Sequence, residues 1–260
     1  MLDGEPKILD DAPIVRLLGP ERATRLKEHP DEVQTASARR LRAHVLLRSR
    51  FAEDRLAAAV ERGVRQYVLL GAGLDTFALR QPAWAQRLTI VEIDQPATQA
   101  AKRARFEELG IAVPRNVVFA PVDFETTTLR EALPAAGVDM SAPVFFSWLG
   151  VTMYLTDDAV DQVLRTIAQL PPGTEVVLTF ATPPDPQEEP ARVAFAQRAA
   201  EVGEPWITFF TPEALEHRLR SSGFSAVTFL TPAVARERYF RDRHDGLEAP
   251  RRVSIASAVV

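Results

Sequence analysis

Residues 67–75 read YVLLGAGLD, and this stretch says most about the fold. Its first four residues form a short, continuous apolar run, which is typical of a parallel strand buried on both faces. The run leads into Gly71-Ala72-Gly73, and ligands of open α/β sheets bind at the carboxyl ends of the strands. Gly71 permits a tight turn, and Gly73 lets the backbone approach a ligand closely. The stretch therefore predicts a first strand and a ligand-binding loop, although two glycines alone also fit a purely structural turn.

Outward from this strand, helical and strand patterns alternate along most of the chain. Helices are predicted over residues 34–62, 76–86, 96–109, 127–136, 156–170 and 211–222, and further strands over residues 88–93, 117–120, 144–148, 175–180, 226–230 and 253–260. The last strand is expected to run antiparallel, as a hairpin-like partner of the strand before it. Such alternation predicts an α/β fold, a Rossmann-like doubly wound sheet of seven mostly parallel strands with helices on both faces.

We expect one domain over residues 1–260, made of four parts. Residues 1–62 form an N-terminal helical cap, and residues 63–182 form the ligand-binding core. The proline-rich stretch from residue 183 to residue 210 breaks the alternation and predicts a lid insertion. Residues 211–260 complete the sheet.

Composition excludes several classes of function. The net charge is −4 and no apolar run approaches the length of a membrane span, so neither a nucleic-acid partner nor a membrane partner is expected. Cysteine is absent, which excludes thiol catalysis and suits a cytoplasmic protein, as does the acidic start without a secretory pattern. The four histidines lie far apart without ligand spacing, and we expect no metal site.

Acidic residues around the glycine loop discriminate between two kinds of cofactor. A dinucleotide would place its pyrophosphate at the start of the following helix, where a third small residue is usual. Here Thr76 takes that position and Asp75 precedes it, so a carboxylate would repel the phosphates. The same carboxylate would tolerate a cofactor that carries a sulfonium and an ammonium instead. An NAD-dependent oxidoreductase is therefore the weaker alternative.

Two further carboxylates follow predicted strands. Asp94 ends the second strand 23 residues after Gly71, where a carboxylate can accept both ribose hydroxyls. Glu92 lies two residues earlier, points to the same face of the strand and is the second choice. The structural alternative is that Asp94 only caps the following helix. Asp123 follows the third strand, where it could accept an adenine amino group with Phe124 packed on the ring; an Asx-turn is the alternative there.

Several motifs together resemble one family. They read LRSRFAED at residues 47–54, LLGAGLDT at 69–76, VEIDQP at 91–96, GVTMYL at 150–155 and RYF at 238–240. The chain resembles the leucine carboxyl methyltransferase and polyketide O-methyltransferase family, of class I S-adenosylmethionine-dependent methyltransferases. The resemblance covers residues 39–240, most of the chain, and implies S-adenosyl-L-methionine as cofactor and S-adenosyl-L-homocysteine as product.

The resemblance also implies roles for individual residues. Arg48 would pair with the methionine carboxylate. Arg50 would take this role if the alignment with the family is shifted by two residues. The structural alternative is that Arg48 lies on a solvent-exposed face of its helix and binds nothing. The cofactor site would include Gly71, Ala72, Gly73, Asp75, Asp94, Gln95, Asp123 and Phe124. The family often has a glutamate where this chain has Leu149, so the ammonium would rely on loop carbonyls or on Asp75.

Methyl transfer is an in-line displacement that requires alignment and exclusion of water. No dedicated base is evident in the sequence, which favours an acceptor that is already ionised, either a carboxylate or an acidic hydroxyl on a small molecule. Protein C-terminal carboxyl methylation and a non-catalytic methyltransferase-like partner protein are the alternatives. The expected acceptor pocket lies under the N-terminal helices and the lid, with Met153, Tyr154, Trp206, Phe209 and Phe210 as its walls and Tyr154 as the candidate catalytic residue.

Overall fold

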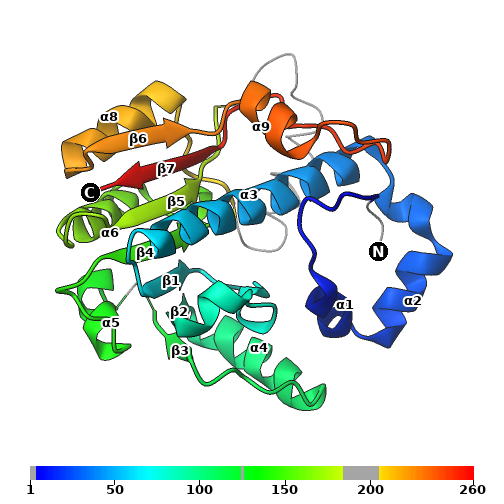
Figure 1. Ribbon diagram of the computed structural model, residues 1–260, viewed down its shortest axis with the longest axis horizontal. Coiled ribbons are helices and arrows are strands. Elements are labelled where there is room, and N and C mark those ends of the chain that lie inside the picture. The colour runs from blue at the N-terminus through cyan, green and yellow to red at the C-terminus, as the bar shows by residue number, and fades with distance from the viewer. Residues whose placement is uncertain (1–3, 124–125, 184–204) are drawn as a thin grey trace.

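The computed structural model describes residues 4–123, 126–183 and 205–260. Seven strands form one sheet in the order β3-β2-β1-β4-β5-β7-β6 (Figure 1). Their bounds are Gln66–Leu70 (β1), Thr89–Asp94 (β2), Val117–Pro121 (β3), Val144–Trp148 (β4), Glu175–Thr179 (β5), Ala226–Phe229 (β6) and Ile255–Val259 (β7). Strands β1 to β5 pair in parallel, whereas β7 is antiparallel to both β5 and β6. The expected doubly wound sheet with an antiparallel last strand is confirmed.

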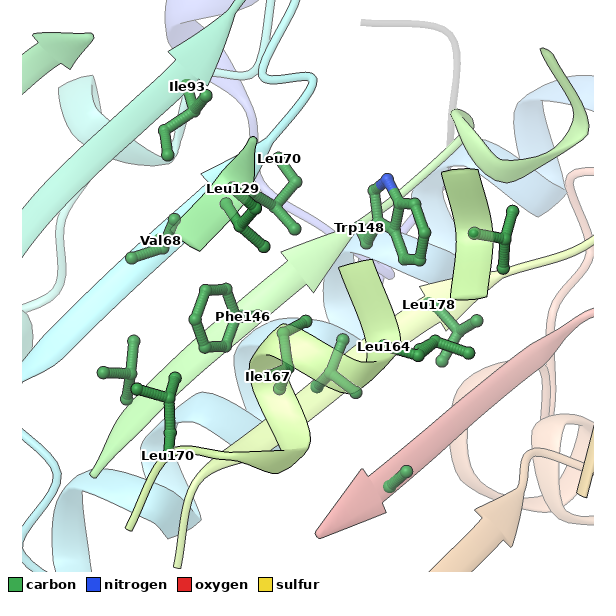
Figure 2. Packing of buried hydrophobic residues seen from close by; sticks show 14 of the residues in the cluster. Val68, Leu70, Ile93, Leu129, Phe146, Trp148, Leu164, Ile167, Leu170 and Leu178 are labelled. Atoms are coloured by element: carbon green, nitrogen blue, oxygen red, sulfur yellow. The ribbon is translucent and has the colours of Figure 1, made fainter. Parts of the chain in front are cut away.

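One face of the sheet packs against α5 (Leu129–Ala135), α6 (Asp157–Ala168) and α8 (Pro212–Ser222). Alternate residues of each strand point to this face, because successive side chains of a strand lie on opposite sides. Figure 2 shows Phe146 and Trp148 of β4 beside Leu164 and Ile167 of α6. These side chains are almost fully buried and form the larger core of the fold.

The opposite face is covered mainly by α3 (Ala36–Glu61), which runs diagonally across the strands in Figure 1. Leu47, Phe51 and Leu56 of α3 pack with Tyr67 and Leu69 of β1 in a second apolar cluster. Helix α9 (Pro232–Tyr239) joins this face, and α4 (Pro96–Glu108) packs beside β3. The packing of α3 on this face of β1 thus places the helix beside the loop that follows the strand.

A buried carboxylate connects α3 to the sheet at its far end. Glu175 of β5 accepts hydrogen bonds from Arg55 Nε at 2.5 Å, from Arg62 Nη2 at 2.6 Å and from Ser257 Oγ at 2.6 Å. Glu175 is fully buried, and a buried carboxylate is tolerated when it is paired and hydrogen-bonded in this way. The network orients α3 relative to β5 and β7.

Of the predicted N-terminal cap over residues 1–62, α3 packs on the sheet, and the name cap is kept below for the part that precedes α3. This part consists of α1 (Ala12–Leu18), α2 (Pro20–Glu28) and the short 3₁₀ helix η1 (Pro30–Val33), which lie to one side of the sheet in Figure 1. Within the described ranges, no helix is both long and apolar enough to cross a membrane.

One predicted helix is wrong. Residues 76–86 form two 3₁₀ turns, η2 (Phe77–Leu79) and η3 (Ala83–Arg87), in place of an α-helix. Pro82 lacks the N–H that a helix interior requires, and it disfavours helical geometry in the residue before it. Helix α9 is a further difference, because no helix was expected between the last two strands.

Candidate functional site

A pocket of about 970 Å³ opens between the carboxyl end of the sheet and the N-terminal cap. One side consists of the loop Gly71–Asp75, and the other consists of residues from α1, α2 and the segment before α1. Helix α3 contributes Arg42, Val45, Leu46, Arg48 and Ser49. The pocket therefore lies between the loop that the sequence predicted as a ligand site and a cap for which the sequence predicted no individual pocket residues.

Backbone hydrogen bonds fix the start of the loop. The N–H groups of Gly71 and Ala72 both donate to the Ile93 carbonyl, at 2.8 and 3.3 Å. Gly71 has a φ of +68°, and a Cβ at this position would lie 2.4 Å from Cγ2 of Val151. Only glycine fits this conformation and this contact without strain, so the loop is determined locally by residue type.

Asp94 lies directly against the loop. Its Oδ2 accepts a hydrogen bond from the Gly73 N–H at 2.5 Å, and its Oδ1 accepts one from the Gln95 N–H at 2.7 Å. Gln95 is exposed at the N-cap of α4. Glu92, the alternative to Asp94, is fully buried and its side chain points into the protein. The geometry thus favours Asp94 as the carboxylate that a ligand at the loop can reach.

A buried lysine supports the loop from below. Lys102 Nζ donates to the backbone carbonyl of Asp75 at 2.7 Å and to Glu92 Oε2 at 2.6 Å. Both partners of this ion pair are almost fully buried, at 2% and 1% side-chain exposure. Burial raises the pKa of Glu92 to about 7, although Lys102 opposes the shift. Lys102 could not be found from the sequence alone, because its role depends on α4 packing behind the loop rather than on any local motif.

Arg48 reaches the pocket from α3. Its Nη1 lies so close to Gly150 that a Cβ on Gly150 would be only 2.5 Å away. Among the residues that the structure describes, its buried Nε finds no hydrogen-bond partner. Burial lowers the pKa of Arg48, while Asp75 and Tyr154 raise it. Arg50, the alternative, instead pairs with Asp54 at 2.8 Å.

Asp75 contributes the opposite charge to the same pocket. Its Oδ1 accepts a hydrogen bond from the Phe77 N–H at 2.7 Å, and within the described part of the chain no cation lies in ion-pair contact with it. Leu149, which replaces the family's frequent glutamate, also lines the pocket. A guanidinium with an unused donor and a carboxylate without a cationic partner suit the two ends of a zwitterionic amino-acid group.

The remaining cofactor candidates lie at the edge of this region. Asp123 follows β3, and its carbonyl accepts the N–H groups of Thr126 and Thr127 at 3.1 and 2.9 Å. It is half-buried and does not line the 970 Å³ pocket. Phe124 lies outside the described residues.

The expected acceptor walls are dispersed. Met153 is buried, and its carbonyl accepts the N–H of Ile207 at 2.8 Å. Tyr154 is half-buried and interacts electrostatically with Arg48. Phe210 is only 4% exposed, belongs to the core and does not line the 970 Å³ pocket. The reason is the Phe210 N–H, which donates to the Ala181 carbonyl and holds the segment against the sheet.

Trp206 and Phe209 pack on each other, with ring centroids 6.5 Å apart, and neither lines the 970 Å³ pocket. Residues 184–204 of the expected lid lie outside the described residues. The described walls of the pocket come instead from the cap, where the sequence offered only helical periodicity and no motif.

A buried histidine lies one turn before Arg48. Burial, and secondarily the charge of Arg48, lower the pKa of His44 to about 4. His44 does not line the pocket. Within the described ranges, no three His, Cys, Asp or Glu side chains are grouped as metal ligands.

Comparison with known sequences gives consistent matches. The family model described as leucine carboxyl methyltransferase matches residues 2–168. YktD of Bacillus subtilis (strain 168), whose name assigns it provisionally to the S-adenosyl-L-methionine-dependent methyltransferases, is 32% identical over 244 residues, which cover 92% of this chain and 80% of YktD. A protein of Mycobacterium marinum (strain ATCC BAA-535 / M) with the same assignment is 33% identical and covers 77% of this chain and 66% of its own.

Solved structures show the same fold at lower identity. A DUF574 family protein from Streptomyces avermitilis MA-4680 aligns with a TM-score of 0.57 and 17% identity over 94% of each chain. A structure from Thermobifida fusca YX, assigned provisionally as a methyltransferase, aligns with a TM-score of 0.56 and 20% identity over 94% of this chain and 91% of its own.

Proposed function

Because the chain belongs to the leucine carboxyl methyltransferase family and is an S-adenosylmethionine-dependent methyltransferase, we propose that it methylates an oxygen of a small molecule. The acceptor group is a carboxylate or an acidic hydroxyl, as in a polyketide or another secondary metabolite. The observation that carries this proposal is the charge of the pocket lining. Five cationic side chains line the pocket against three carboxylates, in a protein whose net charge is −4. Such a pocket attracts anions.

Residues that line the pocket and residues beside it fit the cofactor by their chemistry; Arg48 and Asp75 line the pocket, whereas Asp94, Gln95 and Asp123 lie outside its lining. Arg48, whose buried Nε has no hydrogen-bond partner within the described ranges, would bind the methionine carboxylate, and Asp75 with the loop carbonyls would bind the ammonium. Asp94 would accept the ribose hydroxyls while it retains the Gly73 N–H, and Gln95 and Asp123 would lie toward the adenine. The bound cofactor supplies a methyl carbon activated by the sulfonium charge.

Among the residues that the structure describes around the pocket, there is no evident base for a neutral alcohol. No histidine lines it. Of the three carboxylates that line it, Asp10 is paired with Lys7 at 3.0 Å and Asp11 lies 3.7 Å from Arg80, while Asp75 is the one that the ammonium of the cofactor would use. An acceptor that is ionised near neutral pH needs no base, and the chain then has only to align it and exclude water. Tyr154 remains the candidate catalytic residue, as the hydroxyl that interacts with Arg48.

The test uses the chemistry of the product. Purified protein is incubated with methyl-labelled S-adenosylmethionine and three matched probes: a carboxylic acid, a phenol and an amine on one aromatic skeleton. A methyl ester releases volatile labelled methanol in mild alkali, whereas a methyl ether or an N-methyl group does not. We expect label on the acid or the acidic phenol, and little change in turnover above neutral pH. Label on the amine alone, or a steep rise of turnover with pH, would contradict the proposal.

Protein carboxyl methylation is the second candidate, because the matching family model is described as leucine carboxyl methyltransferase and a C-terminal leucine of a protein carries such a carboxyl group. Incubating the same label with a cell extract separates the two by size. Alkali-labile label in the small-molecule fraction supports the proposal, and label confined to protein supports the alternative.

A further inference from the structure

Two exposed apolar side chains line the outer part of the pocket. Val45 is 37% exposed and Leu74 is 57% exposed, and both line the pocket. Leu46 of α3 also lines the pocket, but it is partly buried and packs against the apolar cluster that contains Leu47 and Phe51. Contiguous exposed apolar side chains in a concave site commonly mark a ligand surface.

The cap supplies the facing surface. Ile14, Val15 and Leu18 of α1 line the pocket, as does Leu26 of α2. The first three residues have the i, i+1 and i+4 spacing that places side chains on one side of a helix. Together with Val45 and Leu46 they form two apolar surfaces with the pocket between them; we call this set the cap wall.

Ion pairs hold the cap wall in place. Asp11 accepts the Ile14 N–H at 3.3 Å at the start of α1 and also pairs with Arg80. Arg80 in turn binds both oxygens of Glu53 on α3, at 2.8 and 2.5 Å, and donates to Thr76 Oγ1 at 3.0 Å. Arg80 therefore connects α1, α3 and the loop, so the two sides of the pocket are kept apart at a fixed position.

The volume leaves room for a second ligand. Pockets for one small ligand span roughly 300–1,000 Å³. The pocket of about 970 Å³ is at the upper end of that range, and the cofactor candidates that line it are Arg48 of α3 and residues of the loop, so the surface formed by α1 and α2 is not assigned to the cofactor. The cap wall is the larger remaining surface.

We propose that the cap wall binds the apolar body of the methyl acceptor, so that the acceptor class is an amphipathic acid with a hydrocarbon part of several carbons. This assignment rests on the proposed function, because it takes the group near the loop to be the acid. The hydrocarbon part lies between α1 and α3, and its length and shape set specificity. Arg42, which also lines the pocket, adds positive charge on the same side of α3.

The experiment measures binding of straight-chain monocarboxylic acids, from butanoic to decanoic, to protein saturated with S-adenosylhomocysteine. We expect affinity to rise about threefold to fourfold for each added methylene while the chain stays on the wall, by isothermal titration calorimetry. A flat series would overturn the assignment.

Two variants on one helix supply the matched control. Val45→Asp places a charge on the cap wall, whereas Leu41→Asp makes the same change one turn earlier, at a side chain that is 45% exposed and does not line the pocket. Val45→Asp should lower decanoate affinity at least tenfold and leave S-adenosylhomocysteine affinity unchanged, and Leu41→Asp should alter neither. Equal behaviour of the two variants would overturn the assignment.

Methylation of the same acids distinguishes failure of this inference from failure of the proposed function. Length-dependent binding without ester formation would keep the cap wall and reject a carboxylate as the group that is methylated. Ester formation that is equally efficient for butanoate and decanoate, and equal in both variants, would keep the proposed function and reject the cap wall.

Discussion

The two sides of the pocket are held by different kinds of interaction. On the loop side, backbone hydrogen bonds to Ile93, the Asp94 carboxylate and the buried Lys102 fix residues 71–75. On the cap side, side chains far apart in the sequence hold the segment before α1. Arg243 donates to both oxygens of Asp245 and to the carbonyls of Pro6 and Gly4, and Asp245 accepts the Gly4 N–H at 2.8 Å.

This difference separates the two tasks of the enzyme. A loop set by glycine geometry and a buried pair is rigid, which suits a site that always receives the same cofactor. A cap that is attached by pairs of side chains can accept substitutions at individual residues without disturbing the sheet. We therefore expect substitutions on the loop side to affect cofactor binding and stability, and those on the cap side to affect mainly the acceptor.

The largest effect should come from the loop side. Lys102→Met leaves Glu92 buried without its cation, and breaking a buried ion pair in this way costs about 3–5 kcal/mol. Urea unfolding followed by circular dichroism measures the loss. The double variant Lys102→Met with Glu92→Leu should recover much of it, because no charge then stays buried. Equal stability of the single variant and the wild type would refute this account.

Gly150→Ala should weaken cofactor binding through Arg48. The new Cβ would lie 2.5 Å from Arg48 Nη1 and displace the guanidinium. Gly137→Ala is the control, because its φ of +82° is close to the +79° of Gly150 but nothing lies within 4 Å of its Cβ. Both variants should lose about 1 kcal/mol of stability to backbone strain. Only Gly150→Ala should lower S-adenosylhomocysteine affinity, at least tenfold by calorimetry; equal losses would exclude a role for Arg48.

Asp245→Ala should affect the cap alone. It removes the partner of Arg243, whose side chain is 2% exposed, and frees the Gly4 N–H. We expect a loss of about 1.5–3 kcal/mol in unfolding free energy, as for a charged hydrogen bond, with affinity for S-adenosylhomocysteine within twofold of wild type. The apparent KM for the acid that accepts the methyl group should rise severalfold. A matching loss of cofactor affinity would show that cap and loop are one unit.

The effect that is smallest at neutral pH concerns the pH dependence of stability. The pKa of His44 is lowered to about 4 in the folded protein, below its ordinary value of 6.5. Between these two values the unfolded chain binds a proton that the folded chain does not, so stability falls as the pH falls from 6.5 toward 4. The contribution is at most about 1.4 kcal/mol per pH unit. His44→Gln should flatten this part of the stability profile; an unchanged slope would assign the pH dependence to other groups.

Local sequence was informative where local chemistry decides structure. The apolar run of β1 and the positive φ of Gly71 follow from residue type, so the strand, the loop and the position of Asp94 could be predicted. The same approach failed for residues 76–86, where helical composition outweighed Pro82 in the prediction. It also could not decide whether Phe210 lies in the pocket, because an aromatic residue after an irregular segment looks the same whether it faces a ligand or the core.

The sequence by itself determined the α/β sheet, its antiparallel last strand and the family, because periodicity, glycine turns and motifs are local properties of the chain. The tertiary structure decided which arginine reaches the pocket, since Arg48 and Arg50 differ only in the direction they take from α3. It also decided that Glu92 is paired inside with Lys102 and that the cap wall faces the loop. These relations join residues far apart in the chain, and only packing brings them together.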